Sequence, residues 1–327
     1  MSHTAYVVFT VFSQMAVGAL IAMVIADFLA KGKEDAKFFE TGAWVCVPVA
    51  IIGLIAMLSH EARPFLAMMT MNANLATSWL SRESLVLTVF IVLAVIYTVL
   101  WLFEPEYGSL KGIPLIPKIA KPFIPLRKAV GIISAIVGFA FLGVSAKAYM
   151  MMGLPAMDQA TTPLFFLVTT LLVGVTAVAA VLSVKYVVKK EAVEPFTRLL
   201  WATCGIALVM VIVLLFTLFA NISALQQAGV GVSEGARLAQ AETLKNMLHG
   251  DYTTLFYARV VIGVVLTLVC LAALILPLKK KDISKASVLT LAVFLCALIG
   301  ELLGRAVFFG ANVPLGEVMP YVLSSIL

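Results

Sequence analysis

Charged residues are scarce in this 327-residue sequence. They make up only 12% of the chain, whereas 62% of the residues are hydrophobic and the mean hydropathy is +1.09. A soluble domain of this size has no way to hide so much apolar surface, so soluble enzymes and soluble binding modules are excluded. Apolar stretches of about 20 residues recur along the chain, each long enough to cross roughly 30 Å of hydrocarbon. The sequence therefore predicts a polytopic integral membrane protein of the all-α class.

Histidine and cysteine are also rare, and this restricts the cofactors. A membrane b-type haem normally needs two buried histidines that face each other from helices. His3 lies in the N-terminal tail and His249 in a predicted connection, so only His60 touches a helix end and we expect no haem. The four cysteines lie inside apolar runs without CxxC spacing, which predicts neither an iron–sulfur cluster in this chain nor disulfides. They are Cys46, Cys204, Cys270 and Cys296.

The apolar runs define eight predicted transmembrane helices. We treat residues 1–327 as a single membrane domain, and we expect the first helix to be retained because no basic segment or small-residue cleavage site accompanies it. The predicted helices lie near residues 6–29, 39–58, 83–103, 129–151, 163–187, 199–224, 257–278 and 286–309.

Basic residues concentrate in alternate connections, which predicts the orientation. Of the 23 lysines and arginines, 16 fall in the connections after the first, third, fifth and seventh helices or in the helical turn just before them. The positive-inside rule places these connections in the cytoplasm and both termini on the outer, periplasmic side. The same bias accounts for the net charge of +6 without a nucleic-acid partner. Five prolines in the connection 104–128 predict no regular helix there, whereas 234–248 has helix-forming character.

Ionisable and strongly polar residues inside a bilayer are costly, so each one is a candidate for function. With the predicted orientation, these residues gather in the outer half of the membrane. A polar cluster on one side suits a lipid-soluble molecule with a polar head, and a quinone fits because its ring needs hydrogen bonds and proton exchange. The candidates are Gln14, His60, Glu83, Lys147, Tyr149, Asn221, Arg259, Glu301 and Arg305.

His60 and Glu83 flank one short predicted connection. The pKa of histidine lies near the working pH, so His60 is suited to take a proton from a quinol hydroxyl. A partly desolvated Glu83 is suited to relay that proton outward. The plainer interpretation of His60 is a helix-end residue that hydrogen-bonds at the membrane interface.

The remaining candidates have structural alternatives. Glu301 and Arg305 are four residues apart on one helix face, where they can pair with each other and lock the helix to its neighbours. Gln14 is typical of a hydrogen bond between helices. Arg259 and Lys147 are typical of interfacial anchors.

Several short motifs resemble one family. The stretch Gly300–Gly310 (GELLGRAVFFG) is similar to the last helix of the membrane-anchor subunits of dimethyl sulfoxide reductase, which belong to the complex iron–sulfur molybdoenzyme group. Further similarity lies in Thr10–Gln14 (TVFSQ) with Gly18, in "AMLSHEARP" at 56–64 and in Leu80–Glu83 (LSRE). Other residues match in order: Lys147, Tyr149, Pro155, Thr162, Pro163 and Arg259.

The resemblance implies a multi-pass anchor in the bacterial cytoplasmic (inner) membrane that binds and oxidises menaquinol. It also implies two partners, an iron–sulfur subunit with four clusters and a molybdopterin catalytic subunit outside the membrane. His60 then corresponds to the quinol-site histidine and Glu83 to an acidic residue important for quinol oxidation. The chain itself would be a non-catalytic component that passes electrons from menaquinol to the docked iron–sulfur subunit.

Two alternatives remain from the residues alone. The first is a purely structural anchor, with the quinone chemistry in another subunit. The second is a secondary transporter. A transporter predicts polar groups and broken helices near the midplane, whereas the ionisable residues here favour the outer half. Replacing His60 or Glu83 separates the quinol-oxidising anchor from the structural one, and solute uptake by the chain alone indicates transport.

Overall fold

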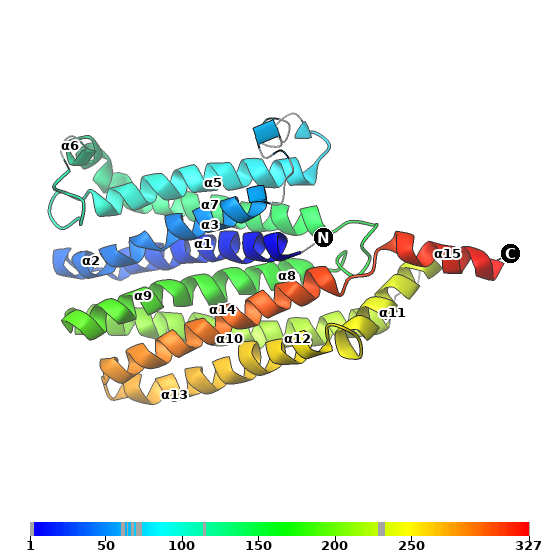
Figure 1. Ribbon diagram of the computed structural model, residues 1–327. Coiled ribbons are helices and arrows are strands. Elements are labelled where there is room, and N and C mark those ends of the chain that lie inside the picture. Colours follow the sequence, from blue (N-terminus) through cyan, green and yellow to red (C-terminus); the bar gives the residue numbers. More distant parts are fainter. Residues whose placement is uncertain are drawn as a thin grey trace.

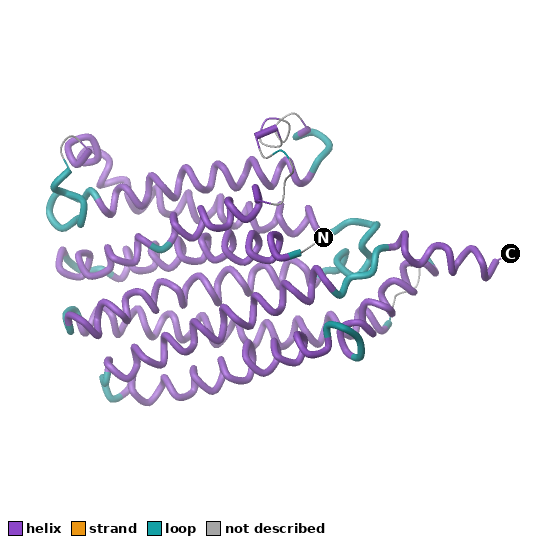
Figure 2. The backbone as a smooth tube through the Cα atoms, viewed as in Figure 1, coloured by secondary structure: helices purple, strands orange, loops and turns teal. Residues whose placement is uncertain are grey.

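The computed structural model is an all-helical bundle (Figures 1 and 2). It describes residues 3–59, 63, 65–66, 69, 74–113, 116–227 and 233–326. Within these residues, eight helices are long and apolar enough to cross a membrane, so the prediction of eight spans is confirmed. The spans are Thr4–Leu29, Lys33–Ser59, Trp79–Leu102, Ile116–Tyr149, Thr161–Lys189, Val193–Gln226, Thr253–Lys279 and Ile283–Pro320.

Most helices begin earlier than the apolar runs do. α10 (Val193–Gln226) begins six residues before the predicted 199–224, and α12 (Thr253–Ala258) begins four residues before 257. An apolar run marks only the part of a helix that lies in hydrocarbon. The backbone hydrogen bonds continue past that boundary, so polar first turns belong to the helix as well.

The second span is divided where a continuous helix was predicted over 39–58. It consists of α2 (Lys33–Phe39), the 3₁₀ segment η1 (Glu40–Trp44) and α3 (Cys46–Ser59). Gly42 in η1 packs tightly, since a Cβ there would lie 2.6 Å from the sulfur of Met23.

The centre of the bundle is formed by α1 (Thr4–Leu29) and by the fifth span, which consists of α8 (Thr161–Val168), η4 (Thr169–Val173) and α9 (Gly174–Lys189). In the most apolar 18-residue stretch of each of these two spans about three quarters of the residues are buried, against less than half in the same stretch of every other span. The two central spans touch at Gly18 and Gly174, where a Cβ on either glycine would overlap the backbone of the opposite helix. Small residues permit such close approach in membrane bundles, and this crossing sets the places of the neighbouring polar side chains.

The connections divide between the two ends of the bundle. One end carries the turns that follow α1, α5 (Trp79–Leu102), α9 and α13 (Thr267–Lys279), and we call it the lysine-rich end (Figure 1). The other, lysine-poor end carries both termini, α11 (Glu234–Leu248) and α15 (Leu315–Ile326). The predicted helix at 234–248 is therefore confirmed, whereas α15 was not predicted.

The proline-containing connection is more helical than predicted. It contains the short helix α6 (Ile116–Ala120) and the 3₁₀ segment η3 (Lys121–Leu126), which leads into α7 (Arg127–Tyr149). Proline is tolerated in a first helical turn because the missing N–H has no partner there, and Pro122 occupies such a place in η3. The expectation of no regular helix in 104–128 was wrong for these two short pieces.

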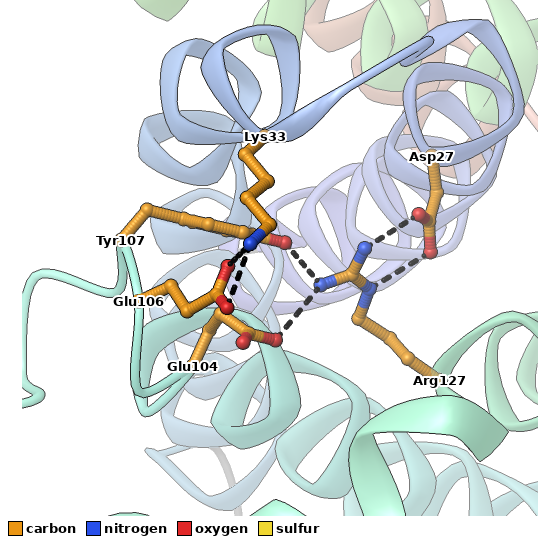
Figure 3. A network of polar contacts seen from close by, with 6 residues as sticks. All are labelled: Asp27, Lys33, Glu104, Glu106, Tyr107 and Arg127. Atoms are coloured by element: carbon orange, nitrogen blue, oxygen red, sulfur yellow. Dashed lines mark hydrogen bonds and ion pairs between the residues drawn. The ribbon is translucent and has the colours of Figure 1, made fainter.

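An ionic network holds this connection to the bundle (Figure 3). Arg127 makes a bidentate pair with the buried Asp27 of α1, with distances of 3.0 and 2.7 Å. It also donates to the Tyr107 hydroxyl at 2.7 Å and lies 3.8 Å from Glu104. Its guanidinium carbon stacks 3.9 Å from the Trp101 ring centroid. One side chain at the start of α7 thus fixes the fold of the preceding loop.

Candidate functional site

Two of the bundle's helices contain wide, π-helical turns. η4 begins at Thr169 inside the fifth span, and η5 (Arg259–Leu266) lies between α12 and α13. The Thr169 hydroxyl lies 3.0 Å from the Phe165 carbonyl, a local contact that competes with the helical ladder. π-turns often accompany functional sites. Here the first residue of each π-turn belongs to the same buried polar cluster.

The centre of that cluster is Arg305 of α14 (Ile283–Gly310), which is 2% exposed. Its Nη2 donates to Gln14 Oε1 of α1 at 2.9 Å and to Thr169 Oγ1 at 3.1 Å. The Thr169 hydroxyl in turn lies 2.7 Å from Glu301 Oε2 and donates to it. The two side chains of the predicted Glu301–Arg305 pair therefore lie in one cluster. They are linked through the Thr169 hydroxyl and not by a direct ion pair.

Arg259 completes this group, which we call the arginine cluster: Gln14, Thr169, Arg259, Glu301 and Arg305. Arg259 is buried and its Nη2 lies 4.0 Å from Glu301 Oε1. The two guanidinium groups stack on neighbouring rings, Arg259 at 4.8 Å from Phe165 and Arg305 at 3.9 Å from Phe166. Arg259 is thus part of the buried bundle and does not act as the interfacial anchor that was the simpler expectation.

The arginine cluster has hydrogen-bonding capacity left over. Two arginines and one glutamate give it a formal charge of +1 in an apolar surrounding. Among the described residues, several of its buried atoms have no hydrogen-bond partner, and unsatisfied buried polar atoms point to a missing water, ion or ligand. These atoms are Gln14 Nε2, Arg259 Nε, Glu301 Oε1 and Arg305 Nε.

Glu83 forms the second part of the site, on α5. The helix begins at Trp79, where the Ser78 hydroxyl caps it by accepting from the Ser81 N–H at 3.3 Å. This start places Glu83 one turn inside the helix, fully buried against α7. The Ser145 hydroxyl of α7 donates to Glu83 Oε1 at 2.5 Å. The other oxygen, Oε2, has no partner among the described residues and is free to take a proton from a ligand.

Tyr149 connects the two parts of the site: it lies one turn after Ser145 on α7, and its ring packs on Phe166, on which Arg305 also stacks. Its ring packs edge-on against Phe166 at 5.8 Å and Phe309 at 5.3 Å. Its hydroxyl is buried without a hydrogen-bond partner in the described part of the chain. The two polar groups thus belong to one continuous region at the lysine-poor half of the bundle.

Other predicted residues lie apart from this region or outside the described chain. The Lys147 side chain, on α7, is exposed. Asn221 of α10 is buried and donates to the Thr161 hydroxyl at 2.9 Å. His60 lies outside the described residues, directly after the end of α3 at Ser59. Ser145 and Thr169 were not predicted at all, because hydroxyl residues are common in apolar helices and have no distinguishing spacing.

Comparison with known proteins identifies the family. The family model for the DMSO reductase anchor subunit (DmsC) matches residues 1–311. The sequence is 27% identical over 315 residues to the YnfH subunit of an anaerobic dimethyl sulfoxide reductase of Escherichia coli (strain K12), and the match covers 95% of each protein. It is also 27% identical over 176 residues to the C subunit of the anaerobic dimethyl sulfoxide reductase of Haemophilus influenzae, covering 54% of this protein and 57% of that one.

A multi-pass membrane protein with these matches is an anchor subunit. The chain belongs to the DMSO reductase anchor subunit family, as the motifs in its first, third and last helices predicted. The α15 helix lies beyond the residues that the family model matches.

Proposed function

We propose that this chain binds and oxidises menaquinol at its lysine-poor end and delivers the electrons to a docked iron–sulfur subunit. The observation that carries the proposal is the fully buried Glu83 carboxylate, which has one oxygen held by Ser145 and the other free. An ionisable group in such a place is costly unless it serves function. A proton acceptor at the edge of a hydrophobic bundle is what quinol oxidation requires.

The orientation follows from the charge of the connections. All lysine-rich turns lie at one end of the bundle (Figure 1), and the positive-inside rule assigns that end to the cytoplasm. The proposed site and both termini then face the periplasm of a bacterium whose inner membrane holds the chain as one membrane domain. Protons accepted at Glu83 leave on the periplasmic side.

The residues present fit a quinol head group. Oxidation of a quinol to a quinone releases two electrons and two protons, so the site must hold two ring oxygens and accept protons. Glu83 Oε2 has a free acceptor position and the Tyr149 hydroxyl is unpartnered among the described residues. We assign proton acceptance to His60 and Glu83, with Glu83 relaying the proton outward. The arginine cluster orients the ring through its unused hydrogen-bonding atoms, and Lys147 contributes at the interface.

The partners follow from the family. Two relatives are named as subunits of anaerobic dimethyl sulfoxide reductase. We propose that this chain likewise anchors an iron–sulfur subunit and a molybdopterin catalytic subunit on its periplasmic face. Among the described residues, no group of three or more His, Cys, Asp or Glu side chains is placed to hold a metal ion. We propose that the electrons from the quinol pass to a redox centre in the docked partner.

The test is quinol-dependent turnover by the intact complex after Glu83→Gln. The substitution preserves the shape of the side chain and its contact with Ser145 but removes the proton acceptor. We expect turnover to fall by on the order of 10²-fold or more, the usual contribution of a general base, while all three subunits still co-purify. Glu83→Asp should restore part of the activity.

Glu40→Gln is the matched control. Glu40 is also a buried carboxylate, 5% exposed, but it lies at the lysine-rich end, where it accepts from the Ser109 N–H at 3.0 Å. It should leave quinol turnover unchanged. Equal turnover in wild type and Glu83→Gln would overturn the proposal and favour a purely structural anchor.

A further inference from the structure

A groove on the outside of the bundle lies at the lysine-rich end, away from the site described above. It has a volume of about 240 Å³ and its lining is entirely apolar. Ile96 and Val99 of α5 form one wall, Val130 of α7 another, and Ile119 of α6 and Phe123 of η3 cover the end. Ordinary lipid-facing surface lies between two helices, whereas this groove has a third contributor to its lining, the segment formed by α6 and η3.

The segment that covers the groove is amphipathic. Ile119 is 57% exposed, and Phe123 and Leu126 are each 53% exposed. Lys118 and Lys121 are exposed in the same stretch, and neither forms an ion pair with any residue that the structure describes. Large apolar side chains next to free lysines are typical of a segment that lies in the membrane interface. Its apolar side meets acyl chains and its lysines lie at the depth of the phosphate groups.

The groove is preformed by rigid contacts. Arg127, the first residue of α7, ties the loop before α6 to α1 through Asp27 and Tyr107 (Figure 3). Lys33 adds a pair with Glu106 at 2.8 Å. These contacts use up the acidic side chains of the loop, so they leave Lys118 and Lys121 as uncompensated positive charge beside the groove.

We propose that this groove binds one anionic phospholipid, with an acyl chain against Ile96, Val99 and Phe123 and the phosphate near Lys118 and Lys121. The apolar lining suits an acyl chain, and the two exposed lysines beside it suit an anionic headgroup. Anionic headgroups are attracted to basic segments at the cytoplasmic surface. This inference is independent of quinol oxidation and stands or falls separately from it.

The experiment uses the full chain in its purified complex. The detergent-solubilised complex is exchanged into phosphatidylglycerol or phosphatidylcholine, and the lipid retained per chain is counted by native mass spectrometry. Three variants are compared with the wild type. Lys118→Gln/Lys121→Gln removes the charges, Val99→Phe fills the groove, and Lys279→Gln/Lys280→Gln removes two exposed lysines from another turn at the same end.

We expect the wild type to retain one phosphatidylglycerol in preference to phosphatidylcholine. In the Lys118/Lys121 variant this preference should be about thirtyfold weaker, which is the effect expected of two lysines near a phosphate. Val99→Phe should reduce retention of either lipid, and the Lys279/Lys280 variant should behave as wild type. Equal retention of the two lipids by the wild type, an equal loss in both lysine variants, or full retention after Val99→Phe would each overturn the proposal. Thermal unfolding of every variant confirms that the protein remains folded.

Discussion

Glu301→Gln should destabilise the bundle by removing the one negative charge between two buried guanidinium groups. Glu301 Oε1 lies 4.0 Å from Arg259 Nη2, and Oε2 accepts from Thr169 at 2.7 Å. At 4 Å and an effective dielectric constant of about 20, one charge pair is worth about 4 kcal/mol. Removing one partner of a buried pair costs about 3–5 kcal/mol, because the other charge is left uncompensated. The formal charge of the arginine cluster rises from +1 to +2.

The assay is thermal unfolding of the purified complex, followed by the fluorescence of a thiol-reactive dye on the buried cysteines. A loss of this size lowers the midpoint by on the order of 5–10 °C. The decisive comparison is the double variant Arg259→Gln/Glu301→Gln, in which the cluster returns to a charge of +1. We expect it to recover about 1–3 kcal/mol relative to the sum of the single changes. A double variant no more stable than that sum would refute the electrostatic reasoning.

Three further predictions concern other parts of the bundle. Gly304→Ala should lower both the thermal midpoint and quinol turnover, because the new Cβ would overlap the Arg259 guanidinium and push it away from the arginine cluster. Unchanged values of both quantities would contradict this packing. Asp27→Asn should cost about 3 kcal/mol of stability, because Arg127 keeps only the more distant carboxylate of Glu104 as an ionic partner. The KM for quinol should stay at its wild-type value, which steady-state kinetics on the assembled complex checks. Burial raises the pKa of Glu104 above its ordinary value of 4.5, despite the nearby Arg127. The contribution of Glu104 to stability is therefore full below pH 4.5 and falls as the pH rises above it. Thermal midpoints measured over a series of pH values should show this fall in the wild type and not in Glu104→Gln.

The spans could be predicted from the sequence because crossing hydrocarbon demands about 20 consecutive apolar residues. The helix ends could not, as α10 shows: its first turn contains Glu194 and Pro195, which an apolar window excludes, although both residues fit an N-terminal turn. α15 was missed for a related reason, since it is only 12 residues long and contains Pro320.

The ionisable residues of the candidate site could be predicted from the sequence, but the contacts between them could not. Gln14, Glu301 and Arg305 are polar groups inside apolar runs, and that pattern alone indicated a buried cluster. The spacing of Glu301 and Arg305 suggested a direct pair, whereas Thr169 from a helix 132 residues away in sequence stands between Glu301 and Arg305. A bridging hydroxyl and a π-turn depend on tertiary contacts, so no local pattern predicts them.

The most direct test of quinol oxidation at the lysine-poor end is photo-crosslinking with a photoreactive menaquinone analogue. The assembled complex is irradiated with the analogue bound, and the modified peptides are mapped by mass spectrometry with and without excess menaquinol. We expect displaceable labelling on the first turns of α5, around residues 79–87, and on the end of α7, around 145–149. Displaceable labelling confined to the lysine-rich end, around residues 95–130, would contradict the proposed site.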